Sequence, residues 1–163
     1  MGRIKAKTHL EKLGFADSDK KDPAHDKIQE WVCNHIKEVI DKTVMRTNDK
    51  PYKISRPKWE HQLIYQSGNY RVIVGFIDVK VSIKGEFYFS DTKQVEEFSK
   101  DVFIEIKTQI PTLGELIRQM RSYEAYAAPQ TEFVVVSPDD KYENILADQG
   151  FHFFKYNDPS KLF

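Results

Sequence analysis

The stretch from residue 102 to 108, VFIEIKT, most limits what this chain can fold into. Apolar residues alternate there with Glu105 and Lys107, and successive side chains of a β-strand point to opposite faces of the sheet. Glu105 and Lys107 therefore share one face of a predicted strand. The residues predicted to pack under a helix on the other face are Val102, Ile104 and Ile106. A carboxylate beside an ammonium on a rigid sheet can bind a divalent cation and hold a water molecule.

The bulk composition is that of one domain of ordinary size. The chain has 163 residues, of which 40% are hydrophobic and 13% aromatic, and this is enough for one packed core. Its 25 basic and 25 acidic residues cancel. The whole molecule therefore exerts no net electrostatic attraction on nucleic acid, and any such site has to be a local patch.

Cysteine usage and the lack of long apolar runs indicate the cellular compartment. Cys33 is the single cysteine, which excludes an internal disulfide bond and fits a reducing environment. We expect it to pack in the core. No apolar run approaches membrane-spanning length, and the N-terminus MGRIKAKTHL lacks the apolar segment of a signal peptide. We therefore expect a soluble cytoplasmic protein without a membrane partner, folded as a single domain over residues 1–163.

The first third of the chain is expected to be an arm followed by an amphipathic helix. Residues 1–21 are polar and lysine-rich, and we interpret them as an N-terminal arm with one short apolar cluster. Asp22-Pro23 is a typical helix start, because Asp caps unpaired N–H groups and Pro suits the first helical position. Apolar residues then recur with helical spacing, which predicts a helix over residues 23–41. Residues 42–58 are expected to be irregular.

Two hairpins are predicted in the middle of the chain. KWEHQLIYQ and YRVIVGFIDVKVSI are separated by Ser67-Gly68-Asn69, a break that is typical of a hairpin. Lys84-Gly85 is predicted to be another turn, followed by the strand EFYFS. Residues 91–101 are polar and are expected to contain one short helix. The segment 84–101 is therefore interpreted as an insertion between two core strands.

The C-terminal third alternates helices and strands. A helix is predicted from Pro111 and Thr112 to Ala127, followed by TEFVVVS, a continuous apolar run typical of a strand buried on both faces. The sequence Ser137-Pro138-Asp139-Asp140 predicts the start of a second helix that continues to Gly150, and FHFFKY completes the sheet. The order predicts an α/β (α+β) fold, with a mixed central sheet that is parallel at one edge and flanked by helices.

The strand motifs resemble those of the PD-(D/E)XK nuclease superfamily, which has the restriction-endonuclease-like fold. G-F-I-D, from Gly75 to Asp78, is similar to the first motif of that superfamily. E-I-K, from Glu105 to Lys107, matches its second motif. The resemblance implies an αβββαβ core in which both motifs lie on neighbouring strands, and a metal-dependent hydrolysis of DNA phosphodiester bonds.

The helical motifs resemble one branch of the same superfamily. Gln119-x-x-x-Tyr123, on the helix after the E-I-K strand, matches the QxxxY motif of the RecB-type branch. H-D-K-I-Q-E-W, from His25 to Trp31, is similar to the helical histidine motif of that branch. The resemblance spans residues 23–155, which is nearly the whole chain.

Asp78 and Glu105 are the candidate metal ligands. Each lies inside a strongly apolar strand, and a buried carboxylate needs a partner or a metal ion. Mg²⁺ (or Mn²⁺) prefers carboxylate oxygens and retains several waters, so two acids and the Ile106 carbonyl would form such a site. The alternative is that both acids lie on solvated strand faces beside lysines, in surface ion pairs that contribute little.

The other candidate catalytic residues are Lys107, Gln119 and Tyr123. Lys107 is either a simple ion-pair partner of Glu105 or the group that orients the attacking water and offsets charge in the transition state. Gln119 and Tyr123 are i, i+4 neighbours on a helix. Tyr123 belongs to the core stripe in one interpretation. The resemblance instead implies that the amide and the phenol bond near the scissile phosphate or support the metal ligands.

His25 and Glu60 compete for the position of an additional metal ligand. His25 falls on the buried side of the first helix, where a lone histidine is commonly structural. The resemblance makes it a ligand that reaches in from that helix. Glu60, on the first strand, would take the same role, because an acid at that place approaches the metal in related nucleases. We expect one of the two, and not both, to act.

Basic residues cluster in sequence around the strands that lead to Asp78. They are Lys53, Arg56, Lys58, Arg71, Lys80 and Lys84. A solvated face is the default interpretation of such a run. If these residues share the active-site side, they hold phosphates of the nucleic acid and compensate for the zero net charge.

The sequence thus predicts a Mg²⁺-dependent nuclease that hydrolyses DNA, with endo- and exonuclease action both open. The alternative is a catalytically inactive module of the same fold that binds nucleic acid or a protein. A third possibility is a nuclease subunit that needs a helicase or recombination partner. A homodimer is also compatible with the sequence.

Overall fold

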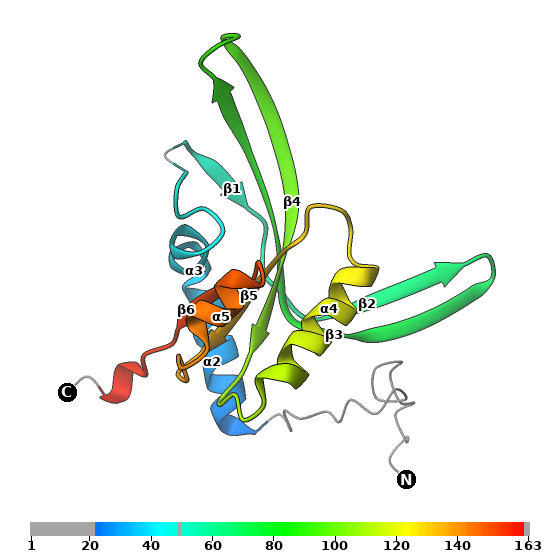
Figure 1. Cartoon of the computed structure of the whole chain (residues 1–163), viewed down its shortest axis with the longest axis vertical. Helices are drawn as coiled ribbons and strands as arrows, with labels where there is room; N and C mark the ends of the chain where they lie inside the picture. The colour runs from blue at the N-terminus through cyan, green and yellow to red at the C-terminus, as the bar shows by residue number, and fades with distance from the viewer. Residues whose placement is uncertain (1–21, 49, 162–163) are drawn as a thin grey trace.

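The computed structural model describes residues 22–48 and 50–161, and it has an α+β fold (Figure 1). Within these residues, four α-helices flank one mixed six-stranded sheet. This confirms the coarse fold class predicted from the sequence. The predicted arm over residues 1–21 lies outside the described residues.

The N-terminal helical region consists of two helices, α2 (Pro23–Asn34) and α3 (Ile36–Lys42). The predicted cap is confirmed, because the Asp22 carboxylate accepts a 2.8 Å hydrogen bond from the His25 N–H. The prediction of one continuous helix over 23–41 was wrong, since the helix is interrupted at His35. There the imidazole stacks on Trp31, with ring centroids 4.3 Å apart, and His35 Nδ1 lies 2.8 Å from the Trp31 carbonyl oxygen. The side chain thus competes with the backbone for that carbonyl.

The sheet has the order β1-β3-β4-β5-β6, and β2 pairs with β3 on the same side as β1. The pairs of β3 with β1, β2 and β4 are antiparallel, whereas β4–β5 and β5–β6 are parallel. The mixed sheet with a parallel edge is therefore confirmed. The strands are β1 (Tyr52–Ile54), β2 (Lys58–Ser67), β3 (Tyr70–Phe89), β4 (Gln94–Ile106), β5 (Glu132–Ser137) and β6 (His152–Lys155). The short β1 was missed by the sequence analysis.

The first hairpin lies where the sequence predicted it. Gly68 and Asn69 form the turn between β2 and β3, and Gly68 has a φ of +58°, which glycine tolerates best. One irregularity was not predicted. Leu63 pairs with Gly75 and Ile64 with Ile73, so Val74 is an extra residue in β3 and forms a β-bulge.

The second hairpin is much longer than predicted, and the expected turn at Lys84-Gly85 was wrong. β3 continues to Phe89, the chain reverses at residues 90–93, and β4 begins at Gln94. The short helix expected within 91–101 is also absent from this described segment, which is strand. Gly85 serves close packing instead of a turn, because a Cβ there would lie 2.8 Å from the Phe98 ring. We call residues 82–101 the long hairpin; it projects from the molecule (Figure 1).

Helices cover both faces of the sheet. One core cluster joins α2 and α3 to the face that bears Val102, Ile104 and Ile106, as the alternation in VFIEIKT predicted. The other cluster joins α4 (Leu113–Tyr126) and α5 (Glu143–Asp148) to the opposite face. The buried stripe of α4 is confirmed by Leu116, Met120 and Tyr123.

The last helix, α5, is shorter than the predicted segment that ended at Gly150. It begins at Glu143, and the Asp139 carboxylate accepts a 2.9 Å hydrogen bond from the Ile110 N–H. The predicted helix start therefore serves, through Asp139, to fix the loop after β4, and the chain from 138 to 142 stays outside the helix. A 3₁₀ turn, η1 (Pro159–Lys161), follows β6.

Replacement of Gly85 by alanine should destabilise the protein. The new Cβ would collide with Phe98 and approach Tyr52, so the ring has to move or the strands have to separate. We expect Gly85→Ala to lower the free energy of unfolding by about 1–3 kcal/mol, as overpacking does. Gly114→Ala is the matched control, because nothing lies within 4 Å of its Cβ position, and alanine is the better helix former by up to about 1 kcal/mol. Urea unfolding followed by circular dichroism measures the stability of both variants. If Gly85→Ala were as stable as Gly114→Ala, the packing role of Gly85 would be contradicted.

The stability should depend on pH through Glu132. Its carboxylate lies 3.0 Å from His152 Nε2 and 3.3 Å from Lys100 Nζ, and the hydrogen bond from His152 is the main cause that lowers the pKa of Glu132. A lowered folded-state pKa adds stability above the unfolded-state pKa of 4.5, and this is lost as the pH falls through the folded value. We expect Glu132→Gln to be less stable than wild type at pH 7, and we expect the difference in unfolding free energy to shrink as the pH falls below 4.5, as measured by urea unfolding. A difference that does not change with pH would contradict this.

Candidate active site

The candidate site lies where β3 separates from β4. Val79 pairs with both Trp59 of β2 and Ile104 of β4, and it is the last residue of β3 in register with β4. The next residue toward the first hairpin is Asp78. Its Oδ2 accepts a 2.8 Å hydrogen bond from the Ile106 N–H, so the side chain takes a donor that the departing strand leaves behind. The location of Asp78 within β3 was predicted, but this bond was not.

Asp78 is also held from α2. Gln29 Nε2 donates a 2.8 Å hydrogen bond to the Asp78 carbonyl, and only 1% of Gln29 is exposed. Both the backbone and the carboxylate of Asp78 are therefore fixed. Gln29 was not singled out from the sequence. Its position four residues after His25, on the same side of the helix, is the signal that would have found it.

Glu105 and Lys107 form a buried ion pair on the α4 side of the sheet. Lys107 Nζ lies 3.3 Å from Glu105 Oε1, and the side chains are 8% and 7% exposed. They alternate with the apolar residues that pack toward α2, so the predicted shared face is confirmed. Burial of two charges costs desolvation free energy, and removal of either partner would leave the other charge buried and unpaired. The pair is therefore an expensive feature for residues that have only a structural role.

The α4 residues Gln119 and Tyr123 join this pair. Gln119 Nε2 donates to Glu105 Oε1 at 3.2 Å and to the Tyr123 hydroxyl at 2.9 Å. The Tyr123 hydroxyl in turn lies 3.5 Å from the Phe76 carbonyl oxygen of β3. The QxxxY residues therefore connect both strands that carry the candidate acids, in addition to the role of Tyr123 in the core.

Of the two candidates for an additional metal ligand, the structure brings His25 to Asp78. His25 is 1% exposed, and its Nε2 lies 3.4 Å from Asp78 Oδ1. Glu60 is exposed and has a φ of +49°. It lies between Trp59 and His61, which pair with Val79 and Ile77, so it occupies the level of Asp78 on the adjacent strand. Both remain predictions as ligands.

The side chains at the site could coordinate a hard cation only if backbone oxygens and water molecules complete its coordination shell. Within residues 22–48 and 50–161, no group of three or more His, Cys, Asp and Glu side chains is arranged to hold a metal ion. Mg²⁺ needs only one or two carboxylates, because it keeps several waters. Asp78 and Glu105 supply two carboxylates, and these two residues and the Ile106 carbonyl all stay predicted ligands.

The predicted nucleic-acid-binding residues lie at different levels of the sheet. Lys58 pairs with Lys80, which pairs with Phe103 on the face of Glu105. Lys53 pairs with Lys84 farther out on the same face of the sheet. Arg56 lies in the exposed connection before β2, and Arg71 pairs with Gln66 near the end of the first hairpin. Only Lys58 and Lys80 are thus placed close to the level of Asp78.

Two titrating groups report on the surroundings of the site. Burial is the main cause that lowers the pKa of His61, followed by repulsion from Lys80 and Lys58, and Asp101 partly offsets this. Burial raises the pKa of the Cys33 thiol to about 11, partly offset by a hydrogen bond with Trp59. Cys33 is half-buried and packs against the α2-side core, as the sequence analysis expected.

No protein-family model, curated protein or solved structure matches this chain. Within the described residues, no helix is both long enough and apolar enough to cross a membrane.

The bond from the Ile106 N–H to Asp78 should contribute measurably to stability. Asp78→Asn keeps an oxygen acceptor in place, whereas Asp78→Leu removes it and leaves a buried N–H without its acceptor. We expect the leucine variant to lose about 1–3 kcal/mol of unfolding free energy more than the asparagine variant. Urea unfolding of both variants tests this, and the same two substitutions at Asp148, which is exposed on α5, are the control. Equal losses for the two Asp78 variants would show that the bond does not matter.

Proposed function

We propose that this protein is a metal-dependent nuclease that hydrolyses DNA phosphodiester bonds with the αβββαβ core of the PD-(D/E)XK superfamily. One observation supports the proposal most. Asp78, the buried Glu105–Lys107 pair and Gln119, which are far apart in sequence, form one connected set where β3 and β4 separate. The chain order α2, β2, β3, β4, α4, β5 is compatible with that core.

Asp78 and Glu105 would hold Mg²⁺ or Mn²⁺, with the Ile106 carbonyl and either His25 or Glu60 as further ligands. When bound, such a cation lowers the pKa of a coordinated water and shields the phosphate charge. In hydrolysis, the water oxygen forms a bond to phosphorus, the bond from phosphorus to the leaving sugar oxygen breaks, and that oxygen gains a proton.

The residues around the two acids have distinct positioning roles. Lys107 places an ammonium beside Glu105, where it orients the water and offsets the negative charge that grows on the phosphate. Gln119 holds one Glu105 oxygen, and Gln29 holds the backbone of Asp78. Lys58 and Lys80 would contact substrate phosphates next to the site, with Lys53, Arg56 and Arg71 as more distant contacts. A reducing, cytoplasmic location is part of the proposal, since the chain has one cysteine.

A second candidate function is a nuclease-fold module that binds nucleic acid or a protein without cleaving. The observation that favours it is the lack, among the described residues, of three side-chain ligands grouped for a metal. Calorimetric titration with Mn²⁺ separates the two functions. Binding of Mn²⁺ that is lost in Asp78→Asn supports the nuclease. Equal DNA binding with and without metal, and no cleavage, would support the module. Cleavage that appears only with a helicase or recombination partner would identify a nuclease subunit.

The catalytic proposal predicts metal-dependent cleavage that depends on three side chains. Purified protein is incubated with labelled single- and double-stranded DNA and RNA, with Mg²⁺, Mn²⁺ or EDTA. We expect Asp78→Asn, Glu105→Gln and Lys107→Met each to reduce the cleavage rate by about 10²-fold or more.

Matched controls separate these effects from general charge loss. Lys37→Met and Glu38→Gln remove the same charges on the exposed surface of α3, and they should cleave at the wild-type rate. Wild-type rates in the Asp78 and Lys107 variants, with folding confirmed by circular dichroism, would overturn the proposed mechanism.

A further inference from the structure

The long hairpin carries like charges directly opposite one another. Lys84 of β3 pairs with Lys53 of β1, and the next outward-facing pair is Glu86 with Glu97 of β4. All four side chains are exposed. Opposite charges stabilise such cross-strand pairs and like charges destabilise them. The hairpin therefore holds two unfavourable pairs next to each other, of opposite sign.

These four charges share one face of the hairpin. Lys84 and Glu86 are two residues apart on β3, so they point the same way and lie about 7 Å apart along the strand. Within the described residues, none of the four belongs to an ion pair. Both pairs border one hollow of about 730 Å³ beside Gly85. The charges thus meet solvent, in a concave place that a partner can fill.

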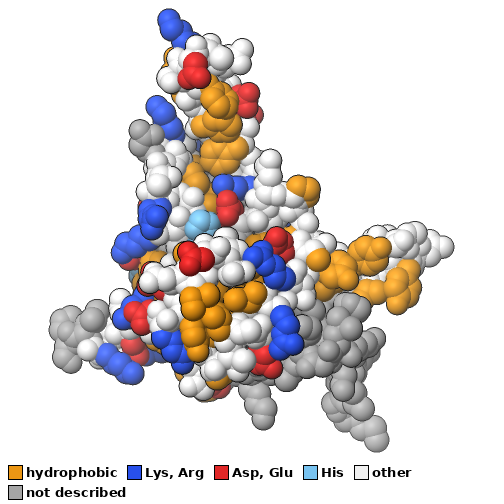
Figure 2. Space-filling model, in the orientation of Figure 1, with side chains coloured by type: hydrophobic (Ala, Val, Ile, Leu, Met, Phe, Trp, Pro, Cys, Tyr) orange, Lys and Arg blue, Asp and Glu red, His pale blue; other side chains and the backbone are white. Residues whose placement is uncertain are grey.

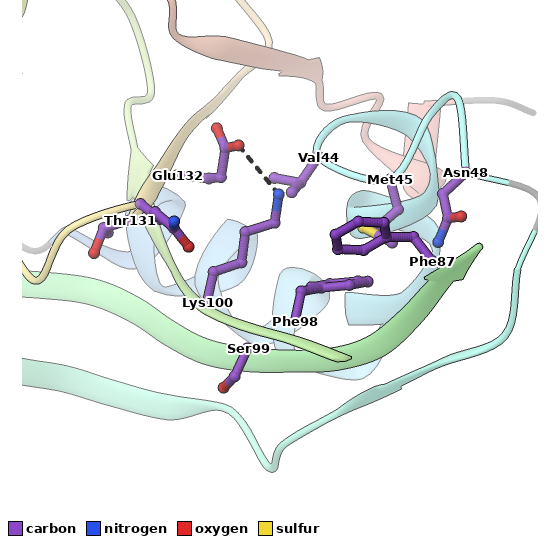
Figure 3. A pocket seen from close by; sticks show the side chains of 10 residues that line it. Val44, Met45, Asn48, Phe87, Phe98, Ser99, Lys100, Thr131 and Glu132 are labelled. Carbon is purple, nitrogen blue, oxygen red and sulfur yellow. Dashed lines mark hydrogen bonds and ion pairs between the residues drawn. The ribbon is translucent and has the colours of Figure 1, made fainter. Parts of the chain in front are cut away.

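The opposite face of the hairpin is already anchored. Phe98 packs against the α2-side core, and the Phe87 and Phe98 ring centroids are 6.2 Å apart. Figure 3 shows these rings beside Met45, and Lys100 near Glu132 at the other end of the same pocket. The base of the hairpin therefore has a fixed orientation that presents the charged face outward.

The tip of the hairpin has no such support. Tyr88 and Val95 pair across the strands on the charged face and are 48% and 57% exposed. Figure 2 shows apolar and acidic side chains close together near this tip. A hairpin of only two strands is marginally stable in water, and burial of an exposed aromatic–aliphatic pair would stabilise it.

We propose that this face is a two-fold interface between two copies of the chain. The long hairpins lie face to face and antiparallel, with the symmetry axis at the level of Gly85. Lys84 of each copy then faces Glu86 of the other, because a two-fold axis reverses the order of the positive and negative levels along β3. Lys53 and Glu97, on the strands at either side of β3, lie diagonally across from Glu86 and Lys84 of the other copy. Each copy supplies the charges that the other needs.

The charge pattern favours a second copy over other occupants. A nucleic-acid backbone would be repelled by Glu86 and Glu97, and a basic peptide by Lys53 and Lys84. A single exposed ion pair contributes little, so Tyr88 and Val95 of each copy, which then lie over the level of Ser82 and Asp101 of the other, have to supply part of the affinity. The complementary charges chiefly set the register and exclude wrong partners. In this arrangement Lys53 contacts the second copy instead of a distant substrate phosphate, whereas Lys58 and Lys80 stay assigned to the candidate active site.

A charge-swap experiment tests the interface. The acidic variant carries Lys53→Glu and Lys84→Glu, and the basic variant carries Glu86→Lys and Glu97→Lys. Sedimentation velocity over a concentration series, in low and high salt, should show a wild-type dimer that weakens with salt. Each variant alone should dimerise more weakly by about tenfold or more. The equimolar mixture should recover the wild-type affinity as a one-to-one heterodimer, seen by native mass spectrometry.

The controls separate a specific interface from a general effect of altered charge. Lys141→Glu with Lys155→Glu makes the same charge change away from the hairpin, and it should dimerise like wild type. A monomeric wild type, variants that dimerise normally, or a mixture that stays monomeric would each overturn the proposal. An acidic variant that loses affinity for labelled DNA and keeps its dimer would also overturn it and assign Lys53 and Lys84 to nucleic acid. None of these outcomes depends on cleavage activity.

Discussion

The candidate site depends on one hydrogen bond, from the Ile106 N–H to the Asp78 carboxylate. In a regular ladder a carbonyl of β3 would accept a hydrogen bond from that N–H. β3 is paired with β4 only from Val79 onward, however, and Asp78, one residue before, has already separated from β4. A buried donor without an acceptor is costly, so the departing strand needs a side chain that replaces its own backbone. Asp78 fills this role, and the same bond fixes its carboxylate next to β4. One residue thus satisfies the N–H of the sheet and has its own carboxylate held rigidly.

The buried Glu105–Lys107 pair imposes a second constraint, on α4. Two charges with little exposure need further polar partners, and Gln119 supplies one of them from the helix that covers this face. α4 therefore packs with its apolar stripe and also places an amide over the acid. Both core packing and the two buried charges therefore position this helix. Gln119 accordingly lies at the edge of the apolar stripe of α4, where it reaches Glu105.

Local sequence patterns predicted much of the fold and of the candidate site. The features that they did not predict depend on contacts between residues far apart in the chain. Alternation in VFIEIKT placed Glu105 and Lys107 on one face, because the period of a strand is local. Lys84-Gly85 resembled a turn, yet Gly85 lies within a strand, since the reason for a glycine there is the ring of Phe98. Ser137-Pro138-Asp139-Asp140 likewise resembled a helix start, but the Asp139 carboxylate accepts a hydrogen bond from the Ile110 N–H. Similarly, nothing local to His25 or Glu60 indicates which one approaches Asp78. Such partners lie far along the chain, so no short window of sequence contains them.

β3 runs for 20 residues without interruption, from the turn of the first hairpin to the tip of the long one. Both projecting elements therefore share one continuous backbone, and Asp78 lies within it. A molecule that binds to either hairpin therefore contacts the strand that carries this carboxylate. The separation of the two hairpins in space does not make them structurally independent.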